Sequence, residues 1–291
     1  MNKCYLCPRN CGANRNLTSG FCGAKKLKIS KVMVHEWEEP VISGTKGSGA
    51  IFFTHCPLKC DFCQNYEISH LGNGKEITVY ELAEIFKELE SKDVHNINLV
   101  SGTQFVNEII DALKIYKPQI PVVWNSSGYE NLETIEKLKP YIDIYLPDLK
   151  YFSNELSEKY SKTNSYFNIA SQAILQMRKN APEDVIENGI MKKGLIVRHL
   201  ILPSHYEDSK KIFNWINNNL GNTTYISVMS QYIPCFKANY SPINRKITAL
   251  EYKIVLKEIE KLNFVNGFYQ ELESASTDFI PNFKIDYWQE K

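Results

Sequence analysis

The cysteines of this chain are grouped in a way that indicates bound metal. Cys235 stands alone, and the other seven of the eight cysteines form two short groups: Cys4, Cys7, Cys11 and Cys22, then Cys56, Cys60 and Cys63. The N-terminal stretch MNKCYLCPRN lacks the apolar core of a signal peptide, so we expect a cytoplasmic protein whose thiols stay reduced. Grouped cysteines in a reducing compartment indicate metal ligands and not disulfides.

The second group has the spacing CxxxCxxC, within HCPLKCDFC (His55–Cys63). Three thiolates can hold three irons of a [4Fe–4S] cube, which leaves the fourth iron without a ligand from this stretch. An open position on a metal is typical of catalytic sites. The competing interpretation is a three-cysteine zinc site completed by His55, but a histidine directly beside Cys56 gives poor tetrahedral geometry.

The first group supplies four thiolates within nineteen residues, a full tetrahedral set. Tight turns around such a metal need residues like Pro8, Gly12, Gly20 and Gly23. Spacing alone leaves zinc and an auxiliary iron–sulfur cluster equally open. Because four protein ligands leave no open position, we expect a structural or electron-relay role for this site.

Charge and hydropathy limit the partners. The net charge is +1, which argues against nucleic acid, and no run reaches the roughly 18 apolar residues of a membrane span. The charge is uneven, because no acidic residue precedes Glu36 while seven basic ones do. We interpret this as a solvated patch or as charge that balances metal-bound thiolates; a docking face for an acidic partner is the alternative.

Short apolar runs alternate with amphipathic stretches after the turn-rich segment SGTKGSG (Ser43–Gly49), and we therefore divide the chain into a cysteine-rich segment, 1–48, and an α/β domain, 49–291. The predicted strands are Ala50–Phe53, Ile97–Val100, Pro121–Trp124, Ile142–Leu146, Gly194–Ile201 and Thr224–Met229. The predicted helices are Val79–Ser91, Phe105–Tyr116, Leu132–Lys137, a broken Asn154–Lys179, Asp208–Asn218 and Ala249–Leu262. Thr78, with Glu81, and Thr248 are the expected helix N-caps.

Six βα units in succession imply a parallel sheet, because each helix returns the chain to the same edge. A closed eight-stranded barrel would need two more units. The sequence therefore predicts an open, partial (β/α)6 barrel with the CxxxCxxC loop directly after its first strand, at the edge where α/β sheets place their sites.

The CxxxCxxC loop, with aromatic Phe62 before its last cysteine, resembles the radical S-adenosylmethionine (SAM) superfamily. Nearly the whole chain resembles the pyruvate formate-lyase activating enzyme group, in its PflX-type branch. The resembling stretches are CYLCPRNCGANR, GFCG, HCPLKCDFCQNYEIS, NINLVSGTQFV, PVVWNSSGYE, IDIYLPDLKY, RHLILP and SVMSQYIP.

The resemblance implies a [4Fe–4S] cluster whose fourth iron is chelated by the amino and carboxylate groups of SAM. One electron, from a donor such as flavodoxin or ferredoxin, would break the S–C5′ bond and give a 5′-deoxyadenosyl radical. That radical would remove a hydrogen atom from a substrate. Such a cluster is oxygen-sensitive, and the cofactor carries the hard chemistry while the protein positions it.

The resemblance also assigns residues that follow the strands. Ser101, Gly102 and Thr103 stand where relatives carry a Gly-Gly-Glu-like turn that binds the SAM amino group. Since the glutamate is missing, backbone carbonyls, Ser101, Thr103 or Gln104 would replace it; an ordinary turn with Gly102 for close approach is the alternative.

Asp148 and Lys150 match an Asp-x-Lys pair that contributes to SAM binding and a monovalent cation site in the activating enzymes. Asn125 and Ser126 stand where relatives have Asp-Thr, so one carboxylate of that cation site has become an amide. A surface ion pair is the alternative for Asp148 and Lys150.

Arg198 lies in the apolar context VRHLIL, where arginine needs a partner, and its family counterpart reaches into the SAM site. His199 should face the other way as a packing histidine. Gln231 and Tyr232 are candidates for closing the substrate side, and Cys235 is interpreted as a small apolar filler.

Three functions remain open. The first is an activase that draws a hydrogen atom from a backbone glycine of a large partner enzyme, and the second is radical modification of a peptide or small molecule. A non-enzymatic iron–sulfur scaffold or electron carrier is the weakest, because it leaves the three-cysteine loop unexplained. The ferredoxin-like insert that some activases carry after the CxxxCxxC loop is absent from this sequence.

Overall fold

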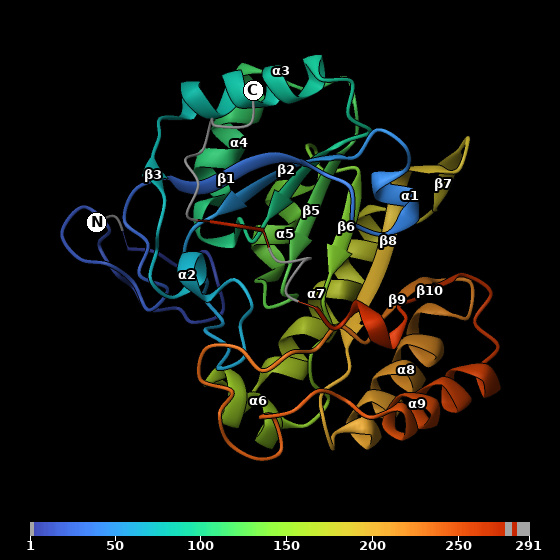
Figure 1. Cartoon of the computed structure of the whole chain (residues 1–291). Helices are drawn as coiled ribbons and strands as arrows, with labels where there is room; N and C mark the ends of the chain where they lie inside the picture. Colours follow the sequence, from blue (N-terminus) through green and yellow to red (C-terminus); the bar gives the residue numbers. More distant parts are fainter. Residues whose placement is uncertain (1–2, 277–280, 284–291) are drawn as a thin grey trace.

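The fold is a ten-stranded, mostly parallel sheet curved into an open barrel, seen in the computed structural model, which describes residues 3–276 and 281–283 (Figure 1). In spatial order the strands run β10-β9-β8-β6-β5-β4-β2-β1-β3, and β7 pairs with β8 off this path. Because β10 and β3 are the two ends of that order, the sheet does not close. The predicted α/β class and the partial barrel are confirmed.

All six strands predicted from apolar runs are present, as β2, β4, β5, β6, β8 and β9. The strand bounds are β1 (Lys28–His35), β2 (Ser48–Phe53), β3 (Lys75–Glu76), β4 (Ile97–Val100), β5 (Val122–Ser126), β6 (Ile144–Pro147), β7 (Val185–Glu187), β8 (Ile190–Leu200), β9 (Tyr225–Met229) and β10 (Gly267–Tyr269). Strands such as β4 are buried along their whole length because helices and the barrel interior cover both of their faces.

Four strands were not predicted, namely β1, β3, β7 and β10. β1 pairs antiparallel with β2, and β10 adds a short parallel strand beyond β9. The sequence of β1, KISKVMVH, mixes two lysines among its apolar residues, so it lacks the clear signal of the inner strands. Since β1 lies in the sheet, the chain enters the barrel at residue 28, and the division at residue 48 remains a prediction.

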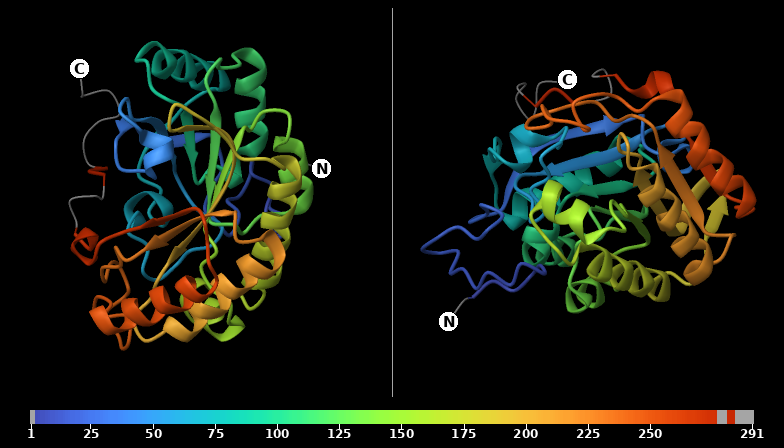
Figure 2. Two further views of the ribbon diagram at one scale, coloured as in Figure 1. Left: turned by 90° about the vertical axis from the view of Figure 1, so that its right-hand side faces the viewer. Right: turned by 90° about the horizontal axis from the view of Figure 1, so that it is seen from below.

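The helices lie mostly on the outer side of the barrel (Figure 2). Their bounds are α1 (Pro40–Ser43), α2 (Tyr66–Ser69), α3 (Val79–Ser91), α4 (Val106–Ile115), α5 (Leu132–Leu138), α6 (Asn154–Ser161), α7 (Tyr166–Asn180), α8 (Tyr206–Leu220) and α9 (Ala249–Lys261), with 3-10 turns η1 (Thr103–Phe105) and η2 (Leu272–Ser274). In the described parts of the chain, no helix is long and apolar enough to cross a membrane.

Local sequence signals explain where the helices begin and end. The capping box predicted at Thr78 is present, because its hydroxyl accepts from the Glu81 N–H at 3.1 Å and the Glu81 carboxylate accepts from the Thr78 N–H at 2.7 Å. Thr248 caps α9 in the same way, as predicted. The predicted break in Asn154–Lys179 is also confirmed, since α6 ends at Lys162 in a left-handed conformation and α7 begins at Tyr166.

One large apolar core fills the space between the helices and the sheet. Trp124 and Tyr145 are completely buried on neighbouring strands β5 and β6. Burying a side chain of this size stabilises the fold by about 1.5–3 kcal/mol. This packing fixes the positions at which each strand ends, and those ends carry the polar residues considered next.

Candidate active site

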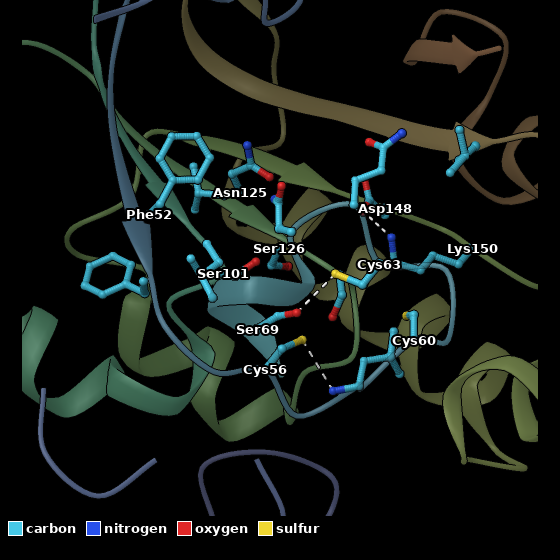
Figure 3. A pocket seen from close by; sticks show the side chains of 18 of the residues that line it. Phe52, Cys56, Cys60, Cys63, Ser69, Ser101, Asn125, Ser126, Asp148 and Lys150 are labelled. Atoms are coloured by element: carbon cyan, nitrogen blue, oxygen red, sulfur yellow. Dashed lines mark hydrogen bonds and ion pairs between the residues drawn. The ribbon is translucent and has the colours of Figure 1, made fainter. Parts of the chain in front are cut away.

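Cys56, Cys60 and Cys63 lie on the loop that leaves the carboxyl end of β2, and all three line one cavity (Figure 3). His55 and Lys59 have positive φ angles of 68° and 59°, which turn this loop tightly. Burial raises the pKa of Cys60 and of Cys63 to about 11. The free thiols are therefore protonated near neutral pH, and binding iron there would release protons.

Each of the three sulfurs has a hydrogen-bond partner. The Leu58 N–H lies 3.4 Å from the Cys56 sulfur, and the Ser161 hydroxyl donates to the Cys60 sulfur at 3.0 Å. The Ser69 hydroxyl lies 3.1 Å from the Cys63 sulfur (Figure 3). Donors of this kind stabilise thiolates, so the loop is prepared for metal-bound sulfur. His55 packs closely against Gly23 and Gly72, because a Cβ on Gly72 would lie 2.4 Å from its ring.

The cavity has a volume of about 240 Å³ and extends from the cysteines to the strand ends. Its lining includes most of the rim side chains that the sequence predicted: Ser101, Asn125, Ser126, Asp148, Lys150 and Arg198, together with Phe62 from the loop. Figure 3 shows the cysteines facing Asn125, Ser126 and Asp148 across the cavity. Residues from five strand ends thus meet beside the three thiols, as the parallel topology predicts.

Arg198 is the centre of a buried ionic network at the rim. Its Nε donates to Asp148 Oδ1 at 2.9 Å, and one terminal nitrogen donates to Asn125 Oδ1 at 2.6 Å. The other terminal nitrogen lies 3.1 Å from Glu38 Oε2. The buried guanidinium of Arg198 therefore has three hydrogen-bond acceptors. Its side chain is only 13% exposed, so this network is no surface ion pair.

Asp148 also accepts from Lys150 Nζ at 2.6 Å. Burial alone would raise the pKa of Asp148, but Arg198 and Lys150 outweigh it and hold that pKa below its usual range. Burial likewise opposes the charge of Lys150, yet Asp148 and the Cys60 sulfur raise its pKa. Both side chains are therefore charged at neutral pH, and a fixed ammonium lies beside the cysteine loop.

Glu38 is the member of this network that the sequence analysis missed. It follows β1, a strand that was not predicted, and it joins Arg198 to Asn125 by accepting from the Asn125 amide at 3.2 Å. The acidic run Glu36–Glu39, directly after a segment without any acid, was the available signal. It could have been matched to Arg198 only if the strand that carries it to the barrel interior had been recognised.

The turn after β4 only partly follows its predicted role. Ser101 has a positive φ of 59° and lines the cavity. Gly102 permits the predicted close approach, since a Cβ would lie 2.7 Å from the Ile109 side chain. Thr103 lies behind the turn, where its hydroxyl donates to buried Glu130 at 2.8 Å, and Gln104 braces the turn by donating to the Ser101 carbonyl at 2.7 Å.

Aromatic side chains surround the cysteine loop. Phe62 packs edge-to-face against Tyr151, Tyr160 and Tyr232, with ring centres 5.7–6.4 Å apart. The Tyr232 hydroxyl donates to the Ile243 carbonyl at 2.6 Å and is therefore structural, whereas Gln231 lines the cavity. This wall limits the access of water to the three thiols.

His199 is the predicted packing histidine, because its ring nitrogens lie 2.7 Å from the Leu149 carbonyl and 2.8 Å from the Ser209 hydroxyl. Burial lowers its pKa to about 4, so it is neutral. Cys235 follows β9 as a partly buried thiol, and burial raises its pKa. It is not among the residues that line the cavity.

The first cysteine group lies close together in loops that precede β1. Cys7 and Cys22 are buried, Cys4 is partly buried and Cys11 is exposed. Burial raises the pKa of Cys7 to about 12, and the neighbouring thiols Cys22 and Cys4 add to the shift. A Cβ on Gly20 would lie 3.0 Å from the Cys11 sulfur and 3.7 Å from that of Cys22, which explains the glycine.

Backbone N–H groups two residues further along the chain donate to these sulfurs: Arg9 to Cys7, Ala13 to Cys11 and Ala24 to Cys22. The same arrangement joins Leu58 to Cys56 in the second group. As the chain is folded here, no three Cys, His, Asp or Glu side chains within residues 3–276 and 281–283 are arranged to hold a single metal ion.

Arg9 connects the two cysteine groups. From between Cys7 and Cys11, its guanidinium donates to the carbonyls of Pro57 at 2.8 Å and Ser161 at 2.8 Å. It also lies over the Phe21 ring at 4.0 Å. The N-terminal loops therefore hold the back of the CxxxCxxC loop, beside α2 in Figure 1.

An open α/β barrel with three cysteines after its first parallel strand defines a class of iron–sulfur enzymes. The sequence profile of the radical SAM superfamily matches residues 50–216, and the chain belongs to this superfamily. Membership implies a [4Fe–4S] cluster and SAM, and the three hydrogen-bonded thiols beside a cavity fit that requirement.

Two relatives extend this assignment. The chain is 36% identical over 271 residues to an uncharacterised protein of Methanocaldococcus jannaschii, covering 89% of this chain and 75% of that one. It is 25% identical over 180 residues to the pyruvate formate-lyase-activating enzyme of Clostridium pasteurianum, covering 58% of this chain and 68% of the enzyme. The predicted resemblance to the activating enzymes is confirmed at this level.

Solved structures share the fold. Streptococcus suis SuiB bound to its precursor peptide SuiA superposes with a TM-score of 0.51 at 14% identity over 80% of this chain, which spans about half of SuiB (50%). Methylornithine synthase (PylB) superposes with a TM-score of 0.50 at 14% identity, over 81% of this chain and 74% of that enzyme. At these identities the likeness shows the architecture alone.

Proposed function

We propose that this chain cleaves SAM reductively at a [4Fe–4S] cluster held by Cys56, Cys60 and Cys63, and removes a hydrogen atom from a substrate. When bound, the cluster and SAM supply the 5′-deoxyadenosyl radical that performs the abstraction. The observation that carries this proposal is the cavity in which three thiols, each with its own hydrogen-bond partner, face the charged network around Arg198.

In this proposal the rim residues bind and orient SAM. Lys150 and Arg198 are cations next to the cysteine loop, and they attract the SAM carboxylate while Asp148 fixes both of their positions. Ser101, Asn125 and Ser126 offer polar atoms at the neighbouring strand ends. Gly102 and Thr103 act from behind the turn by holding Ser101 in its left-handed conformation, and Phe62 excludes water.

For the substrate, we propose glycyl-radical activation, supported by the similarity to the C. pasteurianum activating enzyme. Radical modification of a peptide or a small molecule begins with the same cleavage and is the alternative. The reductant is a low-potential donor such as reduced flavodoxin or ferredoxin. The eight free thiols support a reducing, cytoplasmic environment for the enzyme.

Anaerobic reconstitution tests the first step. The enzyme should form a [4Fe–4S] electron paramagnetic resonance signal that changes on addition of SAM, and reduction should then yield 5′-deoxyadenosine. Cys60→Ser should abolish that product, whereas Cys235→Ser should retain it as a matched cysteine control. A signal that is indifferent to SAM would contradict the proposal. Products formed with a candidate glycyl-radical partner, or with peptides, then separate the two substrate classes.

We also infer a second metal site at Cys4, Cys7, Cys11 and Cys22. Support comes from four neighbouring thiols, among which Cys22 and Cys4 raise the pKa of Cys7, and from the backbone donors at Cys7, Cys11 and Cys22. Thiolate-bound metals use such N–H donors. The four sulfurs would converge further on binding, in loops that contain neither helix nor strand.

Metal analysis of the Cys56/Cys60/Cys63 triple-alanine variant tests this site and identifies its metal. Residual zinc near one equivalent would define a zinc site, and residual iron with sulfide would define an auxiliary cluster. A well-folded variant that retains neither would refute the second site. Cys7→Ala in the wild-type background should lower stability or electron delivery and still leave a SAM-responsive cluster.

A further inference from the structure

A second pocket, of about 290 Å³, lies in the opening of the barrel. One side of its lining follows β1 and includes His35, Trp37 and Glu39. The other side follows β9 and β10 and includes Gln231 and Gln270. Because β1 and β10 lie toward opposite ends of the sheet, this pocket spans the gap that the open barrel leaves (Figure 1).

The pocket adjoins the cavity beside the cysteines. Five residues line both spaces and separate them: His35, Glu38, Arg198, Met229 and Gln231. A molecule held in the second pocket would therefore lie directly beyond the residues that we assign to SAM. The proposed binding of the cluster and SAM assigns no role to this second pocket.

Three residues of the pocket carry buried polar atoms without a partner in the described part of the chain: His35 Nδ1, Glu39 Oε2 and Gln270 Oε1. An ionised carboxylate oxygen and an amide oxygen can only accept hydrogen bonds, and Nδ1 of a neutral imidazole accepts when its proton is on Nε2. Unsatisfied buried acceptors are rare in folded proteins. Three of them around one pocket indicate an occupant that donates hydrogen bonds.

The charges around the pocket indicate the sign of that occupant. Arg198 already pairs with Asp148 and Glu38, and Lys150 shares Asp148. Glu39, which is 8% exposed, adds a third carboxyl group beside these two cations, and burial raises its pKa to about 7. A positively charged donor beside Glu39 would favour its ionised form and balance the network.

We propose that this pocket is a substrate subsite that binds a cationic nitrogen group, an ammonium or a guanidinium. Glu39 supplies the charge, while His35 and Gln270 accept further N–H donors. The inference rests on the proposed function, because only an enzyme that generates a radical at the cysteines gives the subsite a substrate to position. It narrows the substrate to molecules or peptides with an amine or guanidine.

Titration calorimetry on the reconstituted, SAM-loaded enzyme tests the subsite with three probes: n-butylammonium, n-butylguanidinium and neutral n-butanol. At least one cation should bind about tenfold or more tightly than butanol, since a hydrogen bond to a charged group contributes about one to two decades of affinity. Glu39→Gln should remove that preference. Glu271→Gln deletes the same charge from an exposed neighbour of the pocket and should preserve it.

Absence of cation binding to the wild type, equal binding of butanol, or an unchanged preference in Glu39→Gln would each overturn the subsite. Circular dichroism checks that the Glu39→Gln variant is folded. If the variant does not fold, the comparison of the cations with butanol on the wild-type enzyme still decides the question. Formation of 5′-deoxyadenosine is measured separately. Cleavage without cation binding refutes only the subsite, whereas cation binding without cleavage refutes only the proposed function.

Discussion

Ser69→Ala should make the catalytic cluster harder to reduce. The Ser69 hydroxyl lies 3.1 Å from the Cys63 sulfur, at the end of α2, and its residue is 6% exposed. A reduced cluster carries more negative charge on its sulfur ligands than an oxidised one. The hydrogen bond is therefore stronger in the reduced state, and its removal lowers the reduction potential.

The size of this effect follows from the strength of one buried hydrogen bond. Such a bond contributes about 0.5–1.5 kcal/mol. For a one-electron couple about 59 mV corresponds to a tenfold change, or roughly 1.4 kcal/mol. If the bond acts mainly on the reduced state, the potential should fall by about 20–60 mV.

A redox titration followed by electron paramagnetic resonance measures this shift, with and without SAM. Ser69→Thr keeps the hydroxyl and should restore most of the potential. Ser171→Ala is the matched control, because Ser171 is similarly buried at 4% exposure but bonds to the Asn168 carbonyl on α7. A potential that is unchanged or higher in Ser69→Ala, in a variant with full iron content, would refute the reasoning.

Three further outcomes are expected. Asp148→Asn should lower the free energy of unfolding by about 3–5 kcal/mol in chemical denaturation and weaken SAM binding, because it leaves two buried cations without their shared partner. The control is Asp111→Asn, which removes a carboxylate from an exposed ion pair and should lower the free energy of unfolding by at most about 1 kcal/mol. Arg9→Ala should shorten the lifetime of the catalytic cluster against a chelator, measured by absorbance, and Lys25→Ala in the same loops should not. The hydrogen bond from Arg245 lowers the pKa of Glu251 to about 2 from its ordinary 4.5, so this carboxylate stabilises the fold above pH 4.5 and the contribution is lost as the pH falls toward 2. The free energy of unfolding of Glu251→Gln should therefore depend less steeply on pH between pH 4.5 and 2 than that of the wild type. An equal slope in the two proteins would contradict the assignment of this pH dependence to Glu251.

The inner strands and the cysteine loop were predictable because their signals are local. β4 and β5 are apolar runs bounded by turns, and both lie in the core as expected. The capping box of α3 likewise depends only on four consecutive residues, from Thr78 to Glu81. Parallel strands end at one edge, and the structure brings Asn125 and Arg198, both expected at that edge, within 2.6 Å of each other.

The remaining features depend on contacts between distant parts of the chain. Glu38 meets Arg198 across 160 residues, and only the unpredicted strand β1 makes that contact possible. The resemblance assigned Thr103 to a turn that binds SAM, and in this structure its hydroxyl donates to the buried carboxylate of Glu130. Neither outcome has a signature in the residues near it in the sequence.

Arg9 couples the folding of the N-terminal loops to the position of the CxxxCxxC loop. Its hydrogen bonds to the carbonyls of Pro57, Leu58 and Ser161 hold the loop between Cys56 and Cys60 from outside, and they form only when the N-terminal loops are folded. Those loops have no regular secondary structure to fold them. If the first cysteine group holds a metal, as proposed above, that metal would order these loops and so help the chain to retain iron at the second group.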